Sequence, residues 1–563
     1  MRIGLSPAPA RVTPRRREAG YPLALALAVL LGWAARLYFV LGADFPLHDG
    51  ALFYAMARDL QRSGYLLPAY ASYNSASIPF AYPPLALYAA GLLDDLTPLS
   101  LLDVFRFLPL AVSLLTVAAF FLLGRSMLPS RAATALAVLA FGLLPESFRW
   151  AIMGGGVTRS LGYLFAILAL HQIHSLYADR KSGRALPAAA FAGCAVLSHP
   201  ELGWFTAYSA ALLFAARGRS RAGLVSTVLV ALGTLAITAP WWVAVLARHG
   251  TTAFLSAASR GGPLYSGLAW LLYGNVTGEA YFPFLGALAF LGVLACLAER
   301  RLLVPAWLLL AFLLQPRGAR LEAAVPLALL AGLGAADVLL PLLSGALPVH
   351  PHSPSRPLEP RAPAHPAATE QAPKPEPAAE VTGGLRPRGR LAVALLAFLL
   401  GYEISALRDA QRPYLAALSR DERQAMSWVA TNTPESSAFL VVTSDPWGLD
   451  RSSEWFPVLA GRVSVATVQG YEWAGSAKYA RRIAQNEAAQ ACAARGAECL
   501  EGWARETGVA FTHVYLPRRP PVGHDGECCL SLRSSLSADP RYLLVYDGPG
   551  AVIYRRRSGP DAR

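Results

Sequence analysis

The chain contains about eleven apolar runs, several of them near the roughly 20 residues that a helix needs to cross a hydrocarbon core of about 30 Å. It is 54% hydrophobic and only 15% charged, whereas a soluble protein needs more charge to cover its surface. The sequence therefore predicts an α-helical polytopic membrane protein. The expected spans lie near 21–41, 104–123, 132–148, 161–178, 187–203, 204–216, 223–246, 281–298, 302–315, 322–343 and 391–408.

Basic residues cluster at one set of span ends. Arg15, Arg16 and Arg17 precede the first span, and alternate turns carry further arginines, which is the pattern of cytoplasmic segments. This topology explains the net charge of +14 better than nucleic-acid binding does, so we expect no nucleic-acid partner. We expect a multi-pass protein of the cell (inner) membrane, surrounded by membrane lipids, with a cytoplasmic N-terminus and an external, periplasmic C-terminus.

These features divide the chain into five parts. Residues 1–20 form a basic cytoplasmic N-terminus, and 21–343 form a transmembrane domain whose first external loop is 42–103. Residues 344–390 are rich in Pro and Ala, cannot bury enough apolar surface to fold, and are predicted to be a cytoplasmic linker. The last span, 391–408, leads into an external soluble domain, 409–563.

The external part is predicted to be a small α/β domain. Helical patterns alternate there with short apolar segments that are typical of strands, such as Phe439–Thr443 and Phe511–Leu516. It also holds four cysteines in a compartment where oxidation is possible. We expect the adjacent Cys528 and Cys529 to pair with Cys492 and Cys499, in an order that the sequence does not fix, instead of with each other.

The first external loop collects polar candidates directly after a span. Asp44, His48 and Asp49 precede Ala51–Arg58, an amphipathic segment that suits the membrane interface. This pattern places Asp49 at the N-terminal end of a helix. Asp49 could simply cap that helix, a common use of Asp, but a capped carboxylate is also a fixed one and can carry chemistry.

One run in this loop has a family likeness. HDGALFYAMARDLQRSG (48–64), followed by Leu67-Pro68 and by Tyr82-Pro83-Pro84-Leu85, resembles the first external loop of GT-C fold glycosyltransferases. It is most similar to the protein O-mannosyltransferase and lipid A aminoarabinose transferase families. The chain departs from them in two places: their acidic pair is His48-Asp49 here, and Tyr82 replaces the Lys before the two prolines.

The resemblance implies a GT-C-like membrane glycosyltransferase. Its donor would be a polyprenyl-phosphate sugar, and its acceptor a lipid, polysaccharide or protein at the external face. A carboxylate suits the role of base for an acceptor hydroxyl. Asp49 is the expected catalytic residue, with Asp44 and His48 beside it. The departure at the acidic pair leaves Asp44 as the alternative.

A lipid-phosphate leaving group needs positive charge. Gly154, Gly155 and Gly156 precede a predicted helix and Arg159, and glycines followed by a helix N-terminus favour phosphate. Arg317 and Arg320 lie in a short external turn, on the side that is normally poor in basic residues. We expect Arg159, Arg317 and Arg320 to receive the donor phosphate. The alternatives are a flexible glycine turn and contact with lipid headgroups.

A divalent ion, Mg or Mn, is a further expectation. His199 and Glu201 lie at another external span end and could join His48 and Asp49 in a set of N and O ligands. The competing interpretation is a structural histidine near a helix end.

Aromatic residues of the external domain stand beside carboxylates and amides. Trp447, Trp455 and Tyr471 are candidates for binding an acceptor, because aromatic rings stack on the apolar faces of sugars. A buried aromatic core would explain them equally well. The rival class for the whole chain is a non-catalytic transporter of lipid-linked saccharides or an envelope assembly scaffold. A transporter should show repeated halves and ionisable residues in mid-span, and no clear repeat is present.

Overall fold

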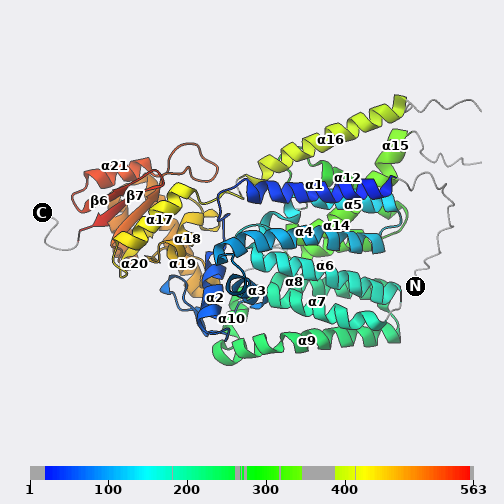
Figure 1. The fold of residues 1–563 in the computed structure, drawn as a ribbon, viewed down its shortest axis with the longest axis horizontal. Coiled ribbons are helices and arrows are strands. Elements are labelled where there is room, and N and C mark those ends of the chain that lie inside the picture. The colour runs from blue at the N-terminus through cyan, green and yellow to red at the C-terminus, as the bar shows by residue number, and fades with distance from the viewer. Residues whose placement is uncertain are drawn as a thin grey trace, which may run out of the picture.

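A computed structural model of the protein shows a helical bundle with a small mixed domain at one end (Figure 1). It describes residues 20–179, 182–259, 267, 269, 271, 276–315, 319–344, 387–412 and 414–557. Most of the predicted linker, 345–386, lies outside these residues, as do Arg317 and the basic residues before Gly20.

A helix is present at each of the eleven predicted spans. The helices run side by side, roughly parallel, in Figure 1. Some spans are short, and α14 continues through a π-helical stretch into α15. The helices are α1 (Tyr21–Leu41), α4 (Leu101–Met127), α5 (Arg131–Leu143), α6 (Gly156–Ala178), α7 (Ala185–Ser198), α8 (Pro200–Leu213), α9 (Arg221–His249), α12 (Phe284–Ala298), α13 (Leu303–Leu314), α14 (Ala319–Leu333) with α15 (Leu340–Ser344), and α16 (Pro387–Gln411).

Not all of these helices can cross a membrane alone. In the described part of the chain, five helices are long and apolar enough, and a sixth span arises if α5 and the bent segment Pro145–Ala151 count as one. Helices α12 and α13 are apolar but shorter. The fold class is nevertheless as predicted: a polytopic helical membrane protein with a C-terminal domain around a small sheet.

A buried arginine joins three parts of the bundle. Arg36 of α1 is fully buried and donates to Ser113 Oγ of α4 at 3.0 Å, to Gly142 O of α5 at 2.9 Å and to Ser147 Oγ at 3.1 Å. Its guanidinium also lies 4.5 Å from the ring centroid of Phe148. A charge in an apolar bundle is costly unless its donors are used. Arg36 therefore holds these segments together.

The loop of residues 42–103, which the sequence predicts to be external and which is called the first loop below, has its own structure. It contains α2 (Ala51–Arg62), the short strands β1 (Tyr70–Ala71) and β2 (Ile78–Pro79), and α3 (Leu85–Leu96). Most residues of α2 are buried, because α3 and α18 (Arg451–Leu459) of the C-terminal domain both pack on it. In Figure 1, α2, α3 and α10 (Thr252–Ala258) lie between the bundle and the sheet.

The C-terminal domain, which the sequence predicts to be external and which is called the external domain for that reason, has a five-stranded mixed sheet in the order β4-β3-β5-β7-β6. Strand β3 pairs in parallel with β4 and β5, whereas β7 pairs antiparallel with β5 and β6. The elements are α17 (Arg420–Asn432), β3 (Ala438–Val441), α18, β4 (Val463–Ser464), α19 (Ser476–Ala491), α20 (Ala497–Thr507), β5 (His513–Pro517), α21 (Leu530–Ala538), β6 (Tyr542–Asp547) and β7 (Ala551–Arg556).

The expected cysteine pairing is wrong. Cys492 is bonded to Cys499, and Cys528 is bonded to its neighbour Cys529. Cys492 ends α19 and Cys499 lies in the first turn of α20, so the short turn between these helices brings the two sulfurs together. Sequence spacing alone could not show this turn.

Candidate functional site

Asp49 lies where the first loop, helix α6 and the external domain meet. Its carboxylate accepts a hydrogen bond from Gly155 N at 3.2 Å and forms an ion pair with Arg159 Nη1 at 3.2 Å. The Asp49 side chain is 13% exposed and that of Arg159 23%, so the pair is largely shielded from water. The structure thus brings together two of the residues expected to act in catalysis and in phosphate binding.

The predicted glycine turn has a definite packing role. The Gly154 amide donates to Leu47 O at 2.9 Å, which brings the 153–156 segment against the backbone around Asp49. A Cβ on Gly154 would lie 2.2 Å from Asp49 O, and a Cβ on Gly155 would lie 3.0 Å from Asp49 Oδ1. Only glycine permits this approach, so the glycines place the α6 N-terminus beside the carboxylate.

Asp49 does not cap α2, which corrects one alternative left by the sequence. The N-cap residue is Gly50, with φ of 131°, and it has no side chain to offer. Glu454 of α18 takes this role: its Oε1 accepts from Gly50 N at 2.8 Å and from Ala51 N at 3.3 Å. Asp49 points instead toward Arg159.

The other two candidates in the loop differ from Asp49. Asp44 has a side chain that is 59% exposed and lies 4.0 Å from Arg423 of α17. His48 is buried, its ring lies 6.2 Å from that of Trp150, and its backbone oxygen accepts from Trp455 Nε1 at 2.7 Å. Burial lowers the pKa of His48, the nearby Asp49 charge opposing this shift. A neutral imidazole at this position can take part in packing without adding charge.

Around Arg159 the bundle presents further polar groups. The Arg159 guanidinium lies 5.2 Å from the centroid of Trp150 and within electrostatic range of Glu201 and Tyr82. Tyr82, which replaces the expected Lys, shares a hydrogen bond of 3.2 Å with Thr158 Oγ1. It also packs against His199, with 6.1 Å between ring centroids. The departure at Tyr82 therefore falls next to Arg159.

The predicted metal set does not form a site. Within the part of the chain that the structure describes, no group of three or more His, Cys, Asp or Glu side chains is placed to hold a metal. Both Asp49 oxygens face N–H donors, and His199 precedes the first turn of α8. The residues His48, Asp49, His199 and Glu201 are therefore not grouped as a ligand set for a divalent ion among the described residues.

A second basic cluster lies at the same end of the bundle. Arg320 forms an ion pair with the buried Glu146 at 3.1 Å, and Glu146 also pairs with Arg149 at 3.0 Å. Arg149 donates to Gln411 Oε1 at 3.2 Å, at the end of α16. No role for Glu146 or for Arg149 was predicted from the sequence. Arg317, the third expected phosphate ligand, lies outside the described residues.

The three aromatic candidates lie in different environments. Trp455 is fully buried and packs on Phe45 and Tyr54 of the first loop, so its ring has no face for a ligand. Trp447 is half-buried beside Tyr479, and it lines a small polar cavity with Asp450, Glu454, Gln469 and Asn486. Tyr471 is half-buried under Arg482, whose guanidinium lies 4.5 Å from its centroid.

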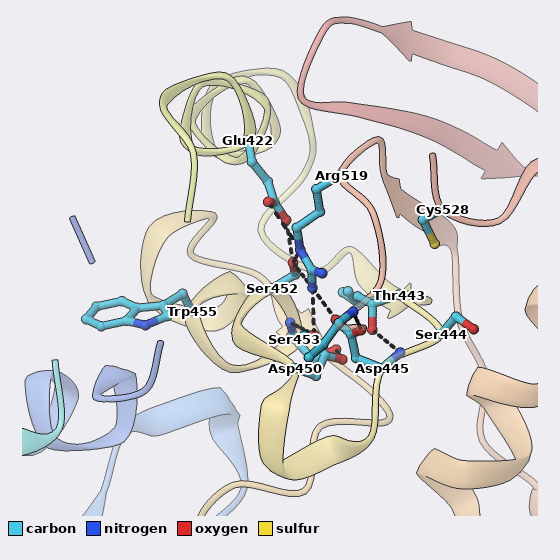
Figure 2. A network of polar contacts seen from close by, with 12 residues as sticks. Glu422, Thr443, Ser444, Asp445, Asp450, Ser452, Ser453, Trp455, Arg519 and Cys528 are labelled. Carbon is cyan, nitrogen blue, oxygen red and sulfur yellow. Dashed lines mark hydrogen bonds and ion pairs between the residues drawn. The ribbon is translucent and has the colours of Figure 1, made fainter. Parts of the chain in front are cut away.

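Behind Trp455, a network of charged side chains fixes the start of α18 (Figure 2). Arg519 lies at its centre, with Nη2 2.6 Å from Asp445 Oδ2 and 3.8 Å from Asp450 Oδ1. Its Nε lies 3.6 Å from Glu422 Oε2, and it donates to Ser452 Oγ at 3.1 Å. Burial raises the pKa of Glu422 and of Asp450, and Arg519 opposes both shifts. Figure 2 shows Trp455 pointing away from this network.

The fold is similar to that of solved membrane proteins, although no protein-family model and no curated sequence matches the chain. One is the archaeal oligosaccharyltransferase AglB from Archaeoglobus fulgidus, in complex with an inhibitory peptide and a dolichol-phosphate. The two are 16% identical with a TM-score of 0.53, over 90% of this chain and 70% of that one.

Two further structures agree. ArnT from Cupriavidus metallidurans, bound to undecaprenyl phosphate, is 14% identical with a TM-score of 0.51, over 96% of this chain and 99% of that one. The arabinofuranosyltransferase AftD from Mycobacteria is 14% identical with a TM-score of 0.50, over 98% of this chain and 40% of that one. All three have the GT-C fold, and so does this chain, as its first loop indicated.

Proposed function

We propose, with the GT-C fold as the premise, that the chain transfers a sugar from a polyprenyl-phosphate-linked donor to an acceptor at the external face of the membrane. The observation that carries the proposal is the Asp49–Arg159 pair. It joins a carboxylate and a guanidinium that are 110 residues apart in the chain, beside the glycines that precede the N-terminus of α6. Solved structures of similar fold were obtained with dolichol-phosphate and with undecaprenyl phosphate.

The reaction assigns opposite roles to the two charges. Asp49 accepts the proton of an acceptor hydroxyl while that oxygen forms a bond to the anomeric carbon of the donor. The bond from this carbon to the phosphate oxygen breaks, and the polyprenyl phosphate leaves with its negative charge. Arg159 and Arg320 stabilise that charge, because a guanidinium donates to phosphate oxygens through a fork of N–H groups. Shielding from water strengthens both interactions.

Acceptor recognition is assigned to the external domain near Trp447 and Tyr471. Trp447 lines a cavity together with Glu454, which contacts the first loop, and Tyr471 belongs to the turn Tyr471–Trp473, which contacts β2 of that loop. The cavity next to Trp447 holds only about 10 Å³, close to the space of one water. A sugar or peptide would therefore lie across its mouth.

The experiment measures release of free polyprenyl phosphate from a panel of polyprenyl-phosphate sugars, with purified protein and acceptor-containing membranes. We expect release by the wild type and at least a hundredfold loss in Asp49→Asn, within the range of about 10²–10⁴ for a general base. Asp44→Asn is the matched control and should stay active, since Asp44 is exposed and lies beside Arg423.

Three outcomes separate the alternatives. Activity in Asp49→Asn with loss in Asp44→Asn would move the base to Asp44. No release by the wild type from any donor would contradict the transferase assignment and favour a transporter or scaffold. Unchanged transfer in Trp447→Ala would remove Trp447 from the acceptor site.

A further inference from the structure

Helix α2 begins just after Asp49, and the backbone amides at its start have no side-chain acceptor at the N-cap position. The first amides of any helix lack partners within the helix, and a side chain at the N-cap position usually accepts from them. Here the N-cap is Gly50, with φ of 131°, a conformation that other residues rarely adopt. A Cβ at Gly50 would also lie 2.4 Å from the backbone of Gly154. The close packing beside Asp49 therefore requires a glycine at the N-cap position, so the loop has no capping side chain of its own.

Glu454 supplies that cap from the external domain, 404 residues further along the chain. One oxygen accepts from both Gly50 N and Ala51 N, and the residue is buried. Two neighbouring contacts fix the same place: Trp455 Nε1 donates to His48 O at 2.7 Å, and Tyr73 OH donates to Glu454 O at 2.6 Å. The contacts at His48 O and at the Gly50 amide lie on either side of Asp49 in the chain, and the Tyr73 contact holds the backbone of Glu454.

The helix that carries Glu454 is itself held rigidly. Asp450 caps α18, accepting from Ser453 N at 3.0 Å, and it faces Arg519. Ser452, on the same turn, accepts from Arg519 as well (Figure 2). The buried charges of the domain thus fix the direction in which Glu454 leaves α18.

The protonation state of Glu454 suits this role. Burial raises the pKa of its carboxyl well above the ordinary value, and the charge of Asp49 raises it further. The backbone amides of Gly50 and Ala51, which donate to the carboxylate, oppose this shift. A glutamine at 454 offers the same accepting oxygen and would keep the cap.

We propose that Glu454 is a positioning residue for Asp49, through which the external domain fixes the catalytic carboxylate and takes part in the chemical step. This inference rests on the proposed function. It differs from acceptor recognition by the same domain, because the contact is with the backbone of the catalytic loop and not with a ligand.

The test compares Glu454→Ala, Glu454→Gln and Asn74→Gly in the full-length protein. Asn74→Gly is the docking control: Asn74 exchanges two hydrogen bonds with Ser464, at 2.9 and 2.8 Å, and so joins the same loop to the same domain without involving the amides of Gly50 and Ala51. With φ of 55° at Asn74, glycine introduces no strain. The measurements are kcat and KM for the donor, and hydrogen exchange of the amides at 50–54.

We expect Glu454→Ala to lower kcat by about 10²-fold, the effect of a roughly 1 Å misplacement, with little change in donor KM. It should also accelerate exchange at Gly50 and Ala51. Glu454→Gln should restore both, and Asn74→Gly should leave both near wild type. Loss in Glu454→Gln equal to that in Glu454→Ala would overturn the inference, and so would equal loss in Asn74→Gly, which would reduce Glu454 to a docking contact.

The exchange data keep this test separate from the proposed function. If the wild type transfers no sugar, the proposed function fails whatever Glu454 does. If the wild type is active and Glu454→Ala exchanges faster but turns over normally, Glu454 caps α2 without positioning Asp49, and only the inference fails. Unchanged exchange in Glu454→Ala would show that the cap itself is absent.

Discussion

At the scale of one residue, the raised pKa of the Glu454 carboxyl affects how the stability of the protein depends on pH. The folded-state pKa of this carboxyl lies well above the ordinary 4.5. Between about pH 4.5 and the folded pKa, the folded protein therefore holds a proton that the unfolded chain has released. More protons bound in the folded state means that stability falls as pH rises through this window, by up to about 1.4 kcal/mol per pH unit.

Glu454→Gln should remove this dependence. Because glutamine does not ionise, we expect the melting temperature of the variant, relative to wild type, to rise as the pH increases above about 4.5, up to the pH at which folded Glu454 ionises. Thermal unfolding of detergent-purified protein at several pH values measures it. Glu487→Gln, at an exposed position of α19, is the control and should follow the wild type. Parallel curves for Glu454→Gln and wild type would show that Glu454 is ionised in the fold.

The sequence indicated Asp49 and Arg159 separately, but it did not indicate that they pair or that Glu454 and Trp455 contact the segment around Asp49. Asp49 follows a span, and Arg159 follows three glycines, so both carried a local signal. Glu454 did not: in Ser453-Glu454-Trp455 it reads as a surface acid beside an aromatic residue. Its role depends on a contact 404 residues away, which no local pattern contains. The same holds for Trp455, whose burial follows from packing against the first loop.

At the scale of elements, the crossing of two backbone segments determines where Asp49 points. Segment 47–50 and segment 153–156 touch through Gly50 and Gly154, and the α6 N-terminus then offers Gly155 N to the carboxylate. An added methyl group at Gly154 would overlap Asp49 O, at 2.2 Å. The two segments would have to move apart.

Gly154→Ala should therefore lower transfer by about 10²-fold, because a 1 Å displacement from productive geometry has roughly that effect. The fold as a whole should persist, since the crossing lies at one end of the bundle. Gly502→Ala is the matched control: nothing lies within 4 Å of its added Cβ, in α20. Donor turnover assays measure the difference, and wild-type turnover in Gly154→Ala would contradict the close crossing.

Helix positions were predictable, whereas their ends and breaks were not. Hydropathy located a helix at each of the eleven predicted spans, because burial in lipid requires apolar helices. It did not show the 80° bend that follows α5, or the two-residue strand β4, since both depend on tertiary contacts. The role of Arg36 was not predicted, because the residue lies inside an apolar run. An ionisable residue in a span is nevertheless a signal of packing or function.

At the scale of the whole molecule, the proposed function requires the Asp49 end of the bundle to face outward. The external domain and the first loop lie at this end, and the arginine-rich turn before α9 belongs to the opposite set of predicted turns. The charge bias and the structure together predict that a reagent outside the membrane reaches the external domain and not the arginine-rich turn before α9.

Single-cysteine labelling tests this orientation. In right-side-out vesicles, an impermeant maleimide should modify Glu506→Cys, at an exposed position in α20, but should modify Arg219→Cys only after lysis. Wild-type protein gives the background from Cys194 and Cys296, which are half-buried and buried. Labelling of Arg219→Cys in intact vesicles would reverse the orientation and place the proposed site inside the cell.

The contact between Gly50 and Glu454 also sets an order of events during biosynthesis. Translation proceeds at about 5–20 residues per second, so the 404 residues between them take roughly 20–80 s to make. Throughout that interval the loop that holds Asp49 has left the ribosome without the residue that caps its helix. Under the proposed function, a nascent chain inserts its membrane helices before the loop that holds Asp49 is complete, and it becomes competent only when the last quarter of the chain has emerged.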